Sequence, residues 1–121
     1  TPKFSFYFLD TGTGTLGNDQ LEALTASMKA DPKRKLVFMH YPPTINTFLF
    51  TVQNTIERNL LLALFADTNV KGVFGGHLHK NDTSDHGKFK EFCLSSFRYQ
   101  EDFALLTVNE ESGEISWTLL H

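Results

Sequence analysis

Disulfide-forming cysteines, long apolar runs and an excess of either charge are all missing from this sequence, and each absence excludes a class of protein. The chain has 1 cysteine, Cys93, which cannot form an internal disulfide. No apolar run approaches the length of a bilayer-spanning helix, so we expect a soluble domain with no membrane partner. Basic and acidic residues number 11 and 14, and both signs are scattered along the chain. Nucleic acid is therefore not an expected partner, because it demands a concentrated basic surface.

The sequence also lacks an initiator methionine and a basic-then-apolar leader, and we therefore expect a processed, trimmed or excised segment. The compartment, cytoplasmic or exported, stays open. Apolar residues are well represented, since 40% of the chain is hydrophobic and 12 residues are Phe. That content supports a real core, and 121 residues allow at most one domain. We expect residues 1–121 to form a single domain or a fragment of one.

Hydrophobic periodicity predicts two helices, each beginning at a polar residue that can cap it. The first follows Asn18 or Asp19 and carries Leu21, Leu24 and Met28 on one face until Asp31 and Pro32 stop it. The second carries Ile56, Leu60, Ala63 and Leu64 on one face and runs to about Ala66. Both are expected to begin with a capping box, made by Asp19 with Glu22 and by Asn54 with Glu57.

Strands are predicted before, between and after these helices, and the first is an almost continuous apolar run of the kind expected to be buried on both faces. A tight turn over residues 110–113 joins the last two strands. The predicted strands are Phe4–Asp10, Lys35–His40, Val70–Phe74, Lys88–Ser95, Phe103–Asn109 and Glu114–Leu120.

Strand, helix, strand, helix, strand predicts an α/β fold with a parallel or largely parallel sheet, whose strands end at one common edge. His40 lies at the end of the second strand, and His77 and His79 follow the third through Gly75 and Gly76. Loops at such an edge gather ligands. We therefore expect these three histidines to lie near one another.

Two imidazoles two residues apart on one side of a turn can share a metal ion or serve two ions about 3.5–4 Å apart, a separation that suits attack on phosphorus. His40 is the natural third ligand. Taken singly, each histidine is more often a satisfied core or surface residue. Their common position at strand ends, with the Gly-Gly hinge, favours the metal interpretation.

At this point the sequence resembles the calcineurin-like metallophosphoesterases. That family has a hydrophobic strand ending in His before a proline turn, and a later strand leading into Gly-His-x-His. The resemblance covers nearly the full chain, including a strand ending in Leu-Asp-Thr and a helix opening with Gln-Leu. The matching segments here are Val37-Phe38-Met39-His40-Tyr41-Pro42-Pro43, Gly76-His77-Leu78-His79, Leu9-Asp10-Thr11 and Gln20-Leu21.

The resemblance implies the C-terminal half of a metallophosphoesterase α/β sandwich, a mixed sheet with βαβαβ followed by antiparallel strands. It implies a phosphatase or phosphodiesterase in which His40 and His77 bind one divalent metal and His79 binds a second, the metals being Mn, Fe or Zn. The family's Asp-x-His, Gly-Asp and Gly-Asn-His motifs are absent from these 121 residues. The catalytic histidine therefore stays unassigned, and the implied partners are a small phosphorylated substrate and an N-terminal half of the same domain, or another chain.

Two alternatives remain open. The chain by itself is an inactive folding or metal-binding module, because half of the implied ligands are missing. Alternatively, residues 12–17 bind a nucleotide, since they satisfy G-x-G-x-x-G between a strand and a helix. The second is disfavoured, because the helix begins only after the third glycine.

Several other polar residues have either a functional or a purely structural role. Tyr41 and Asn81 are candidate substrate-binding residues, and with Asp82 they are otherwise polar loop residues or orient an imidazole. Asp10 is expected to be a turn residue and His86 an exposed one, while His121 is expected to be uninformative. Residues 47–50 form either part of the core or a lip over the site.

Overall fold

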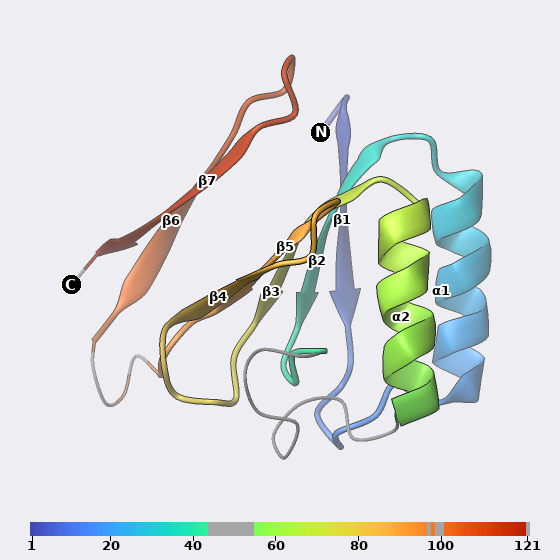
Figure 1. Ribbon diagram of the computed structural model, residues 1–121, viewed down its shortest axis with the longest axis horizontal. Coiled ribbons are helices and arrows are strands. Elements are labelled where there is room, and N and C mark those ends of the chain that lie inside the picture. Colours follow the sequence, from blue (N-terminus) through green and yellow to red (C-terminus); the bar gives the residue numbers. More distant parts are fainter. Residues whose placement is uncertain (44–54, 97, 99–100, 121) are drawn as a thin grey trace.

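The computed structural model describes residues 1–43, 55–96, 98 and 101–120. Within them, a five-stranded sheet carries two helices on one face and a two-stranded hairpin on the other (Figure 1). The helices are α1 (Asn18–Ala30) and α2 (Thr55–Asp67). The strands are β1 (Phe4–Leu9), β2 (Arg34–Met39), β3 (Val70–Gly75), β4 (Asp82–Asp85), β5 (Lys90–Cys93), β6 (Phe103–Val108) and β7 (Ile115–Leu120).

The large sheet has the strand order β1-β2-β3-β5-β4, and its first four members are parallel. This confirms the predicted parallel arrangement, and β6 pairs antiparallel with β7 as expected. The sequence did not predict β4, which pairs antiparallel with β5. Its sequence, Asp-Thr-Ser-Asp, has low β-propensity, so the pairing follows from the free edge of β5 and not from local preference.

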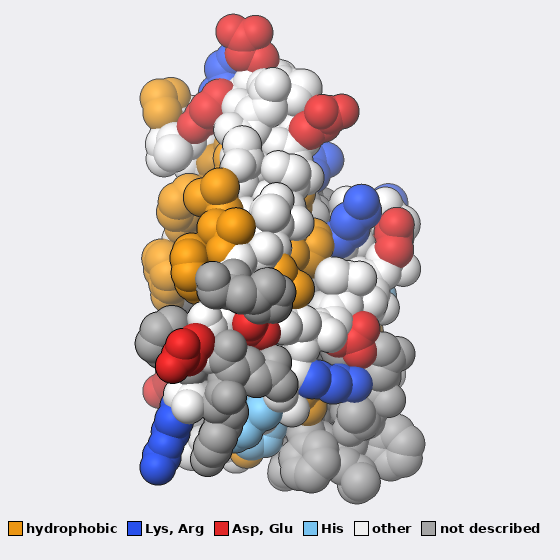
Figure 2. Space-filling model, turned by 90° about the vertical axis from the view of Figure 1, so that its left-hand side faces the viewer, with side chains coloured by type: hydrophobic (Ala, Val, Ile, Leu, Met, Phe, Trp, Pro, Cys, Tyr) orange, Lys and Arg blue, Asp and Glu red, His pale blue; other side chains and the backbone are white. Residues whose placement is uncertain are grey.

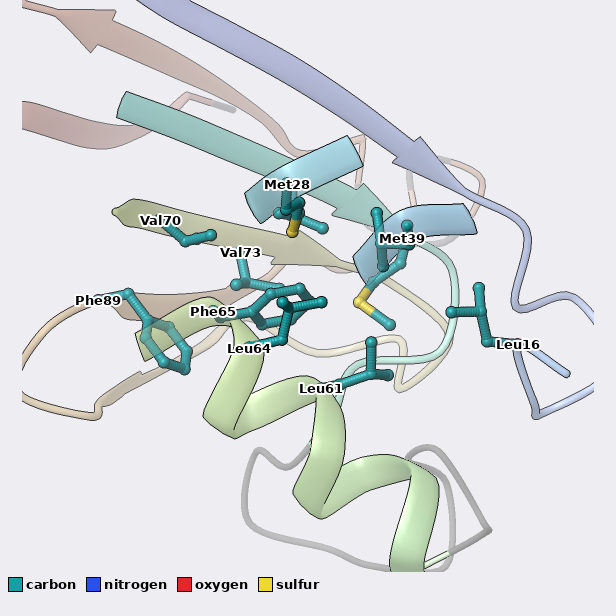
Figure 3. Packing of buried hydrophobic residues seen from close by; sticks show 11 residues of the cluster. Leu16, Met28, Met39, Leu61, Leu64, Phe65, Val70, Val73 and Phe89 are labelled. Atoms are coloured by element: carbon teal, nitrogen blue, oxygen red, sulfur yellow. The ribbon is translucent and has the colours of Figure 1, made fainter. Parts of the chain in front are cut away.

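The main core lies between the sheet and the two helices. Leu61, Leu64 and Phe65 of α2 point toward the sheet, where they meet Val73 of β3 and Met28 of α1 (Figure 3). Leu61, Phe65 and Val73 are fully buried. Burying side chains of this size contributes roughly 1.5–3 kcal/mol each. The predicted stripe of the first helix, Leu21, Leu24 and Met28, therefore faces the core. The stripe predicted for the second helix is wrong, because Ile56 and Leu60 are 74% and 52% exposed and only Leu64 of that set is buried. The apolar residues of α2 cover more than one face, and the sheet selects the face that carries Leu61, Leu64 and Phe65.

A second core lies between the other face of the sheet and the hairpin. Trp117 of β7 stacks on Phe74 of β3 and Phe92 of β5, with ring centroids 5.2 and 5.1 Å away. Gly72 allows this approach, because a Cβ there would come within 2.8 Å of the Ile115 side chain. The hairpin therefore packs directly on the sheet.

The prediction that the first strand is buried on both faces is wrong. Phe6 and Phe8 of β1 are 47% and 74% exposed, although both rings contact Phe38 of the neighbouring strand. The physical reason is position, since β1 is an edge strand and its hairpin-side face is only partly covered. Phe103, Leu105 and Leu120 are also exposed, and Figure 2 shows hydrophobic side chains gathered on the side of the molecule that carries the hairpin.

The predicted capping box of the first helix is also wrong. Gly17 is the N-cap residue of α1, and no side-chain hydrogen bond caps it. Instead, the buried carboxylate of Glu57 accepts hydrogen bonds from the backbone N–H groups of Leu16 and Gly17 and from the Thr15 hydroxyl. The second predicted box begins at Asn54, which lies outside the described residues. Glu57 thus anchors a distant loop from α2.

Within the described residues, no helix combines the length and the apolar content needed to cross a bilayer.

Candidate metal site

Hydrogen bonds join the carboxyl ends of neighbouring parallel strands into one layer. The buried Thr11 hydroxyl, after β1, accepts from the backbone N–H of Tyr41, after β2, at 2.9 Å. The N–H of Gly76 donates to the His40 carbonyl at 3.0 Å, and the N–H of Leu94 donates to the Gly75 carbonyl at 3.0 Å. The loops that carry the predicted ligands are therefore fixed to one another at this edge.

The two glycines of the hinge have different reasons to be there. A Cβ at Gly75 would lie 3.0 Å from Cβ of Pro42, so a larger residue would push the proline turn away. Gly76 has room for a side chain, but its carbonyl accepts from the Cys93 thiol at 3.2 Å and from the N–H of Leu78 at 2.7 Å. Burial raises the pKa of Cys93 to about 11, so its sulfur stays a thiol and can donate.

His40 and His77 meet at this edge. Nε2 of His40 lies 3.2 Å from Nδ1 of His77, and the two rings are nearly perpendicular, with an interplanar angle of 71°. Burial, followed by repulsion from His40 and His79, lowers the pKa of His77. The neutral imidazole is the form that binds metal ions. In Figure 2 histidine side chains lie toward the lower end of the molecule, the end at which the parallel strands finish.

The backbone of the Gly-His-Leu-His turn differs from the extended chain assumed from its sequence. His77 and His79 both have left-handed backbones, with φ of 64° and 54°. Residues with side chains rarely adopt this region, although His is several-fold enriched there, and such conformations cluster at functional sites. A curled backbone replaces the simple two-residue alternation, so the direction of His79 does not follow from that of His77.

His79 lies beyond the His40–His77 pair. It is exposed and close enough to His77 to affect its pKa, but the described part of the chain contains no group of three or more His, Cys, Asp or Glu side chains arranged to hold a metal ion. The structure thus brings together two of the three predicted ligands and keeps the third nearby. The assignment of all three as ligands stays a prediction.

Tyr41 forms one wall of the histidine pair. Its ring stacks on His77 with ring centroids 3.8 Å apart and an interplanar angle of 28°. It meets the His40 ring edge to face, with ring centroids 5.4 Å apart. The proline turn and the Thr11 hydrogen bond hold the backbone of Tyr41 in place. Tyr41 therefore packs directly on the His77 ring, and its role in orienting a metal-binding imidazole stays a prediction.

The side chain of Asn81 is engaged in a structural network. It donates to the buried carboxylate of Asp102 at 2.7 Å and accepts from the backbone N–H of Ser95 at 2.9 Å. Ser95 also donates to Asp102 through its hydroxyl at 2.9 Å. Sequence reasoning missed Asp102, since only the tertiary contact between loops distant in sequence identifies it. Substrate binding by Asn81 stays a prediction, as does that by Tyr41.

The structure describes two of the remaining residues discussed from the sequence, Asp10 and His86. The Asp10 carboxylate accepts from the N–H of Gly12 at 3.1 Å, as expected of a turn residue. The prediction that His86 is exposed is wrong, because its side chain is 21% exposed and Nε2 lies 2.9 Å from a buried oxygen of Glu91. The β4–β5 turn places the ring against the sheet. His121 and residues 47–50 lie outside the described residues.

The glycine loop does not fit a nucleotide phosphate. The Glu57 carboxylate accepts hydrogen bonds from the backbone N–H groups of Leu16 and Gly17, at 3.0 and 2.8 Å. A phosphate group would need such donors and would be repelled by this negative charge. The loop is instead an internal anchor for α1.

Comparison with known proteins finds similarity to a curated protein and to a solved structure. No family model matches the chain. A probable cyclic nucleotide phosphodiesterase of Fibrobacter succinogenes is 31% identical over 121 residues, which cover 96% of this chain and 46% of that protein. The chain thus spans about half the length of that relative. The crystal structure of a dimetal phosphatase from Danio rerio matches with a TM-score of 0.58 and 19% identity, over 67% of this chain and 27% of the other.

The likeness to the Danio rerio structure is one of fold. It confirms the predicted α/β class, a mixed sheet in which βαβαβ precedes antiparallel strands.

Proposed function

We propose that this chain belongs to a metal-dependent phosphoester hydrolase, a phosphatase or phosphodiesterase, and that His40, His77 and His79 are ligands of its two-metal site. The observation that carries the proposal is the convergence of Nε2 of His40 and Nδ1 of His77, 3.2 Å apart, at the carboxyl edge of a parallel sheet. A relative named as a phosphodiesterase and a structural neighbour named as a dimetal phosphatase support the same class of chemistry.

The histidine pair fits a shared divalent ion. Two imidazole nitrogens at about 2.0–2.1 Å from one tetrahedral ion lie about 3.3 Å apart. The 3.2 Å between Nε2 of His40 and Nδ1 of His77, which is also a hydrogen-bond distance, is close to that spacing. Imidazole is a good ligand for Zn and Fe ions, so the donors present suit two of the three metals proposed here. Tyr41 holds the His77 ring in this orientation by stacking on it.

The role of this chain would be to position metal and substrate. Bound divalent ions supply a hydroxide nucleophile and neutralise charge on the phosphoryl oxygens. The hydrogen bonds from Tyr41 to Thr11 and from Gly76 to His40 keep the ligand loops from separating. His79, one residue past Leu78 on the same curled turn, would serve the second ion.

The ligands in this chain are too few for a two-metal centre, and we propose that the others come from the N-terminal half of the same domain, or from another chain. The partly uncovered aromatic face at the edge strand β1 supports this, because Phe8 is 74% exposed there. The chain also spans only 46% of its phosphodiesterase relative. A small phosphorylated molecule is the proposed substrate.

Paramagnetic Mn²⁺ added to the ¹⁵N-labelled chain tests the ligand assignment without relying on turnover. We expect amide resonances of Tyr41 and residues 76–80 to broaden first, and a His40→Ala/His77→Ala variant to lose this effect. His86→Gln is the matched control, since it removes an imidazole elsewhere but keeps a side chain able to bond to Glu91. If the broadening is unchanged in the double variant, His40 and His77 are not the Mn²⁺ ligands and the assignment is wrong.

The second candidate is that the chain by itself is an inactive folding or metal-binding module. It is favoured because the described residues contain no three-residue metal group and so too few ligands for a two-metal centre. Hydrolysis of a chromogenic phosphodiester with added Mn²⁺ separates the two. Appreciable turnover by the 121-residue chain, lost in His79→Ala, would exclude the inactive module. No turnover, together with Mn²⁺ binding at His40 and His77, would favour it for the chain alone.

A further inference from the structure

A cavity of about 510 Å³ lies at the end of the sheet opposite to the histidines. It is bounded by the β4–β5 turn, the beginning of β3 and the β6–β7 turn. Its size falls within the range of about 300–1,000 Å³ typical of small-molecule sites. Lys71, Lys88 and Lys90 line it, opposed by one carboxylate, Glu114. The local excess of two positive charges contrasts with a formal net charge of −3 for the chain.

The sheet geometry explains why these lysines share one cavity. Lys90 alternates with Glu91, so it lies on the same face as Phe92, which packs under the hairpin. Lys88 lies two residues before it. Lys71 reaches this side through an irregularity in β3, where Lys35 pairs with Val70 but Leu36 pairs with Gly72. Lys71 is the extra residue at this point, and a bulge redirects a side chain in this way.

The cavity wall opposite the lysines is fixed to the sheet. The Arg34 guanidinium donates to the carbonyls of Glu110 and Glu111 in the β6–β7 turn, at 3.1 and 3.3 Å. Gly113 in the same turn has φ of 79°, and a Cβ there would lie 2.5 Å from Nε of Arg34. These contacts attach the turn to β2.

None of the three ammonium groups has a hydrogen-bond or ion-pair partner within the part of the chain that the structure describes. Like charges brought together in this way repel one another, and an anion between them relieves the repulsion. Ile115 adds apolar lining, whereas the side chain of Phe89 is buried in the core on the other face of the sheet. The cavity thus offers a cationic rim and a non-polar wall.

We propose that this lysine cavity binds a small phosphorylated molecule, with its phosphate between Lys71, Lys88 and Lys90 and its non-polar part against Ile115. The site is separate from the histidines, because Lys71 and Gly75 lie at opposite ends of β3, about 13 Å apart at a strand rise of about 3.3 Å per residue. A ligand here and a substrate at the metal site can therefore be bound together.

Titration of the ¹⁵N-labelled chain with inorganic pyrophosphate, in buffer containing EDTA, tests the proposal. EDTA removes divalent ions, so binding through the metal site cannot contribute. We expect saturable shifts of amide resonances at residues 87–90 and 113–116, weakened by added salt. A Lys88→Gln/Lys90→Gln variant should bind about 25-fold more weakly, at about fivefold for each exposed charge pair. Both side chains are exposed, so folding should be retained.

A Lys3→Gln/Lys29→Gln variant removes the same amount of charge elsewhere and should titrate as the unaltered chain does. A His40→Ala/His77→Ala variant should also titrate normally, which separates this proposal from the metal site. The proposal fails if both lysine variants lose affinity equally, which would indicate a general charge effect. It also fails if shifts appear away from the cavity, or if pyrophosphate produces none.

Discussion

Removal of the Glu57 side chain is the most direct test of how the fold positions its loops. Its carboxylate, 6% exposed, joins α2 to the loop before α1 through the N–H groups of Leu16 and Gly17 and the hydroxyl of Thr15. Hydrogen bonds to a charged group contribute about 1.5–3 kcal/mol each. Counting only the two backbone donors at the lower value, Glu57→Ala should lower the free energy of unfolding by about 3 kcal/mol.

Glu57→Gln should cost about half as much, because an amide oxygen still accepts while its NH₂ group faces another donor. Urea denaturation followed by circular dichroism measures both losses, and amide hydrogen exchange should accelerate at Leu16 and Gly17. Glu22→Gln, at an exposed position of α1, is the control and should change stability by less than about 0.5 kcal/mol. A loss below about 1 kcal/mol for Glu57→Ala, with unchanged exchange, would refute the anchoring role.

Three further predictions concern other buried or paired groups. Lys35→Met should cost about 2–3 kcal/mol in urea denaturation, because the buried Lys35 ammonium donates to three backbone carbonyls at 2.6–2.8 Å. A hydrogen bond from Ser5, opposed by burial, holds the pKa of Asp31 at about 2 against 3.8 unfolded. Its stabilisation is therefore complete above about pH 4 and is lost as the pH falls toward 2. After discounting for solvent screening this is about 1 kcal/mol, which Asp31→Asn should abolish in acid titrations of stability. Iodoacetamide at pH 8 should alkylate Cys93 about 100-fold more slowly in the folded chain than in urea, because burial raises its pKa from 9.0 to about 11. Comparable rates would contradict that burial.

The sequence predicted most helices and strands because their patterns are local. The stripe of Leu24 and Met28 and the apolar run of β2 each require only one periodicity to identify. Errors arose where a distant partner changed the outcome. Glu57 replaced the expected cap of α1, and the edge of β5 recruited the polar strand β4. Neither partner is visible from the segment it acts on.

In the candidate site, too, local patterns were predictable and the effects of distant contacts were not. The order of strands and helices, with His40 and His77 just past two strand ends, was enough to place both at one edge of a parallel sheet. The left-handed backbones at His77 and His79 depend on packing around the Gly-Gly hinge, and so does the stacking of Tyr41 on His77. These are tertiary effects, which no local pattern encodes.

By itself, the sequence determined the residue types available for chemistry and the edge at which they meet, because hydrophobic periodicity and the right-handed connection between parallel strands restrict the topology to few choices. Tertiary structure alone decided that Nε2 of His40 faces Nδ1 of His77, that Glu57 occupies the glycine loop, and that three lysines share a cavity. Each of these depends on side-chain direction and on contacts between residues distant in sequence. Such contacts form only when the whole chain packs.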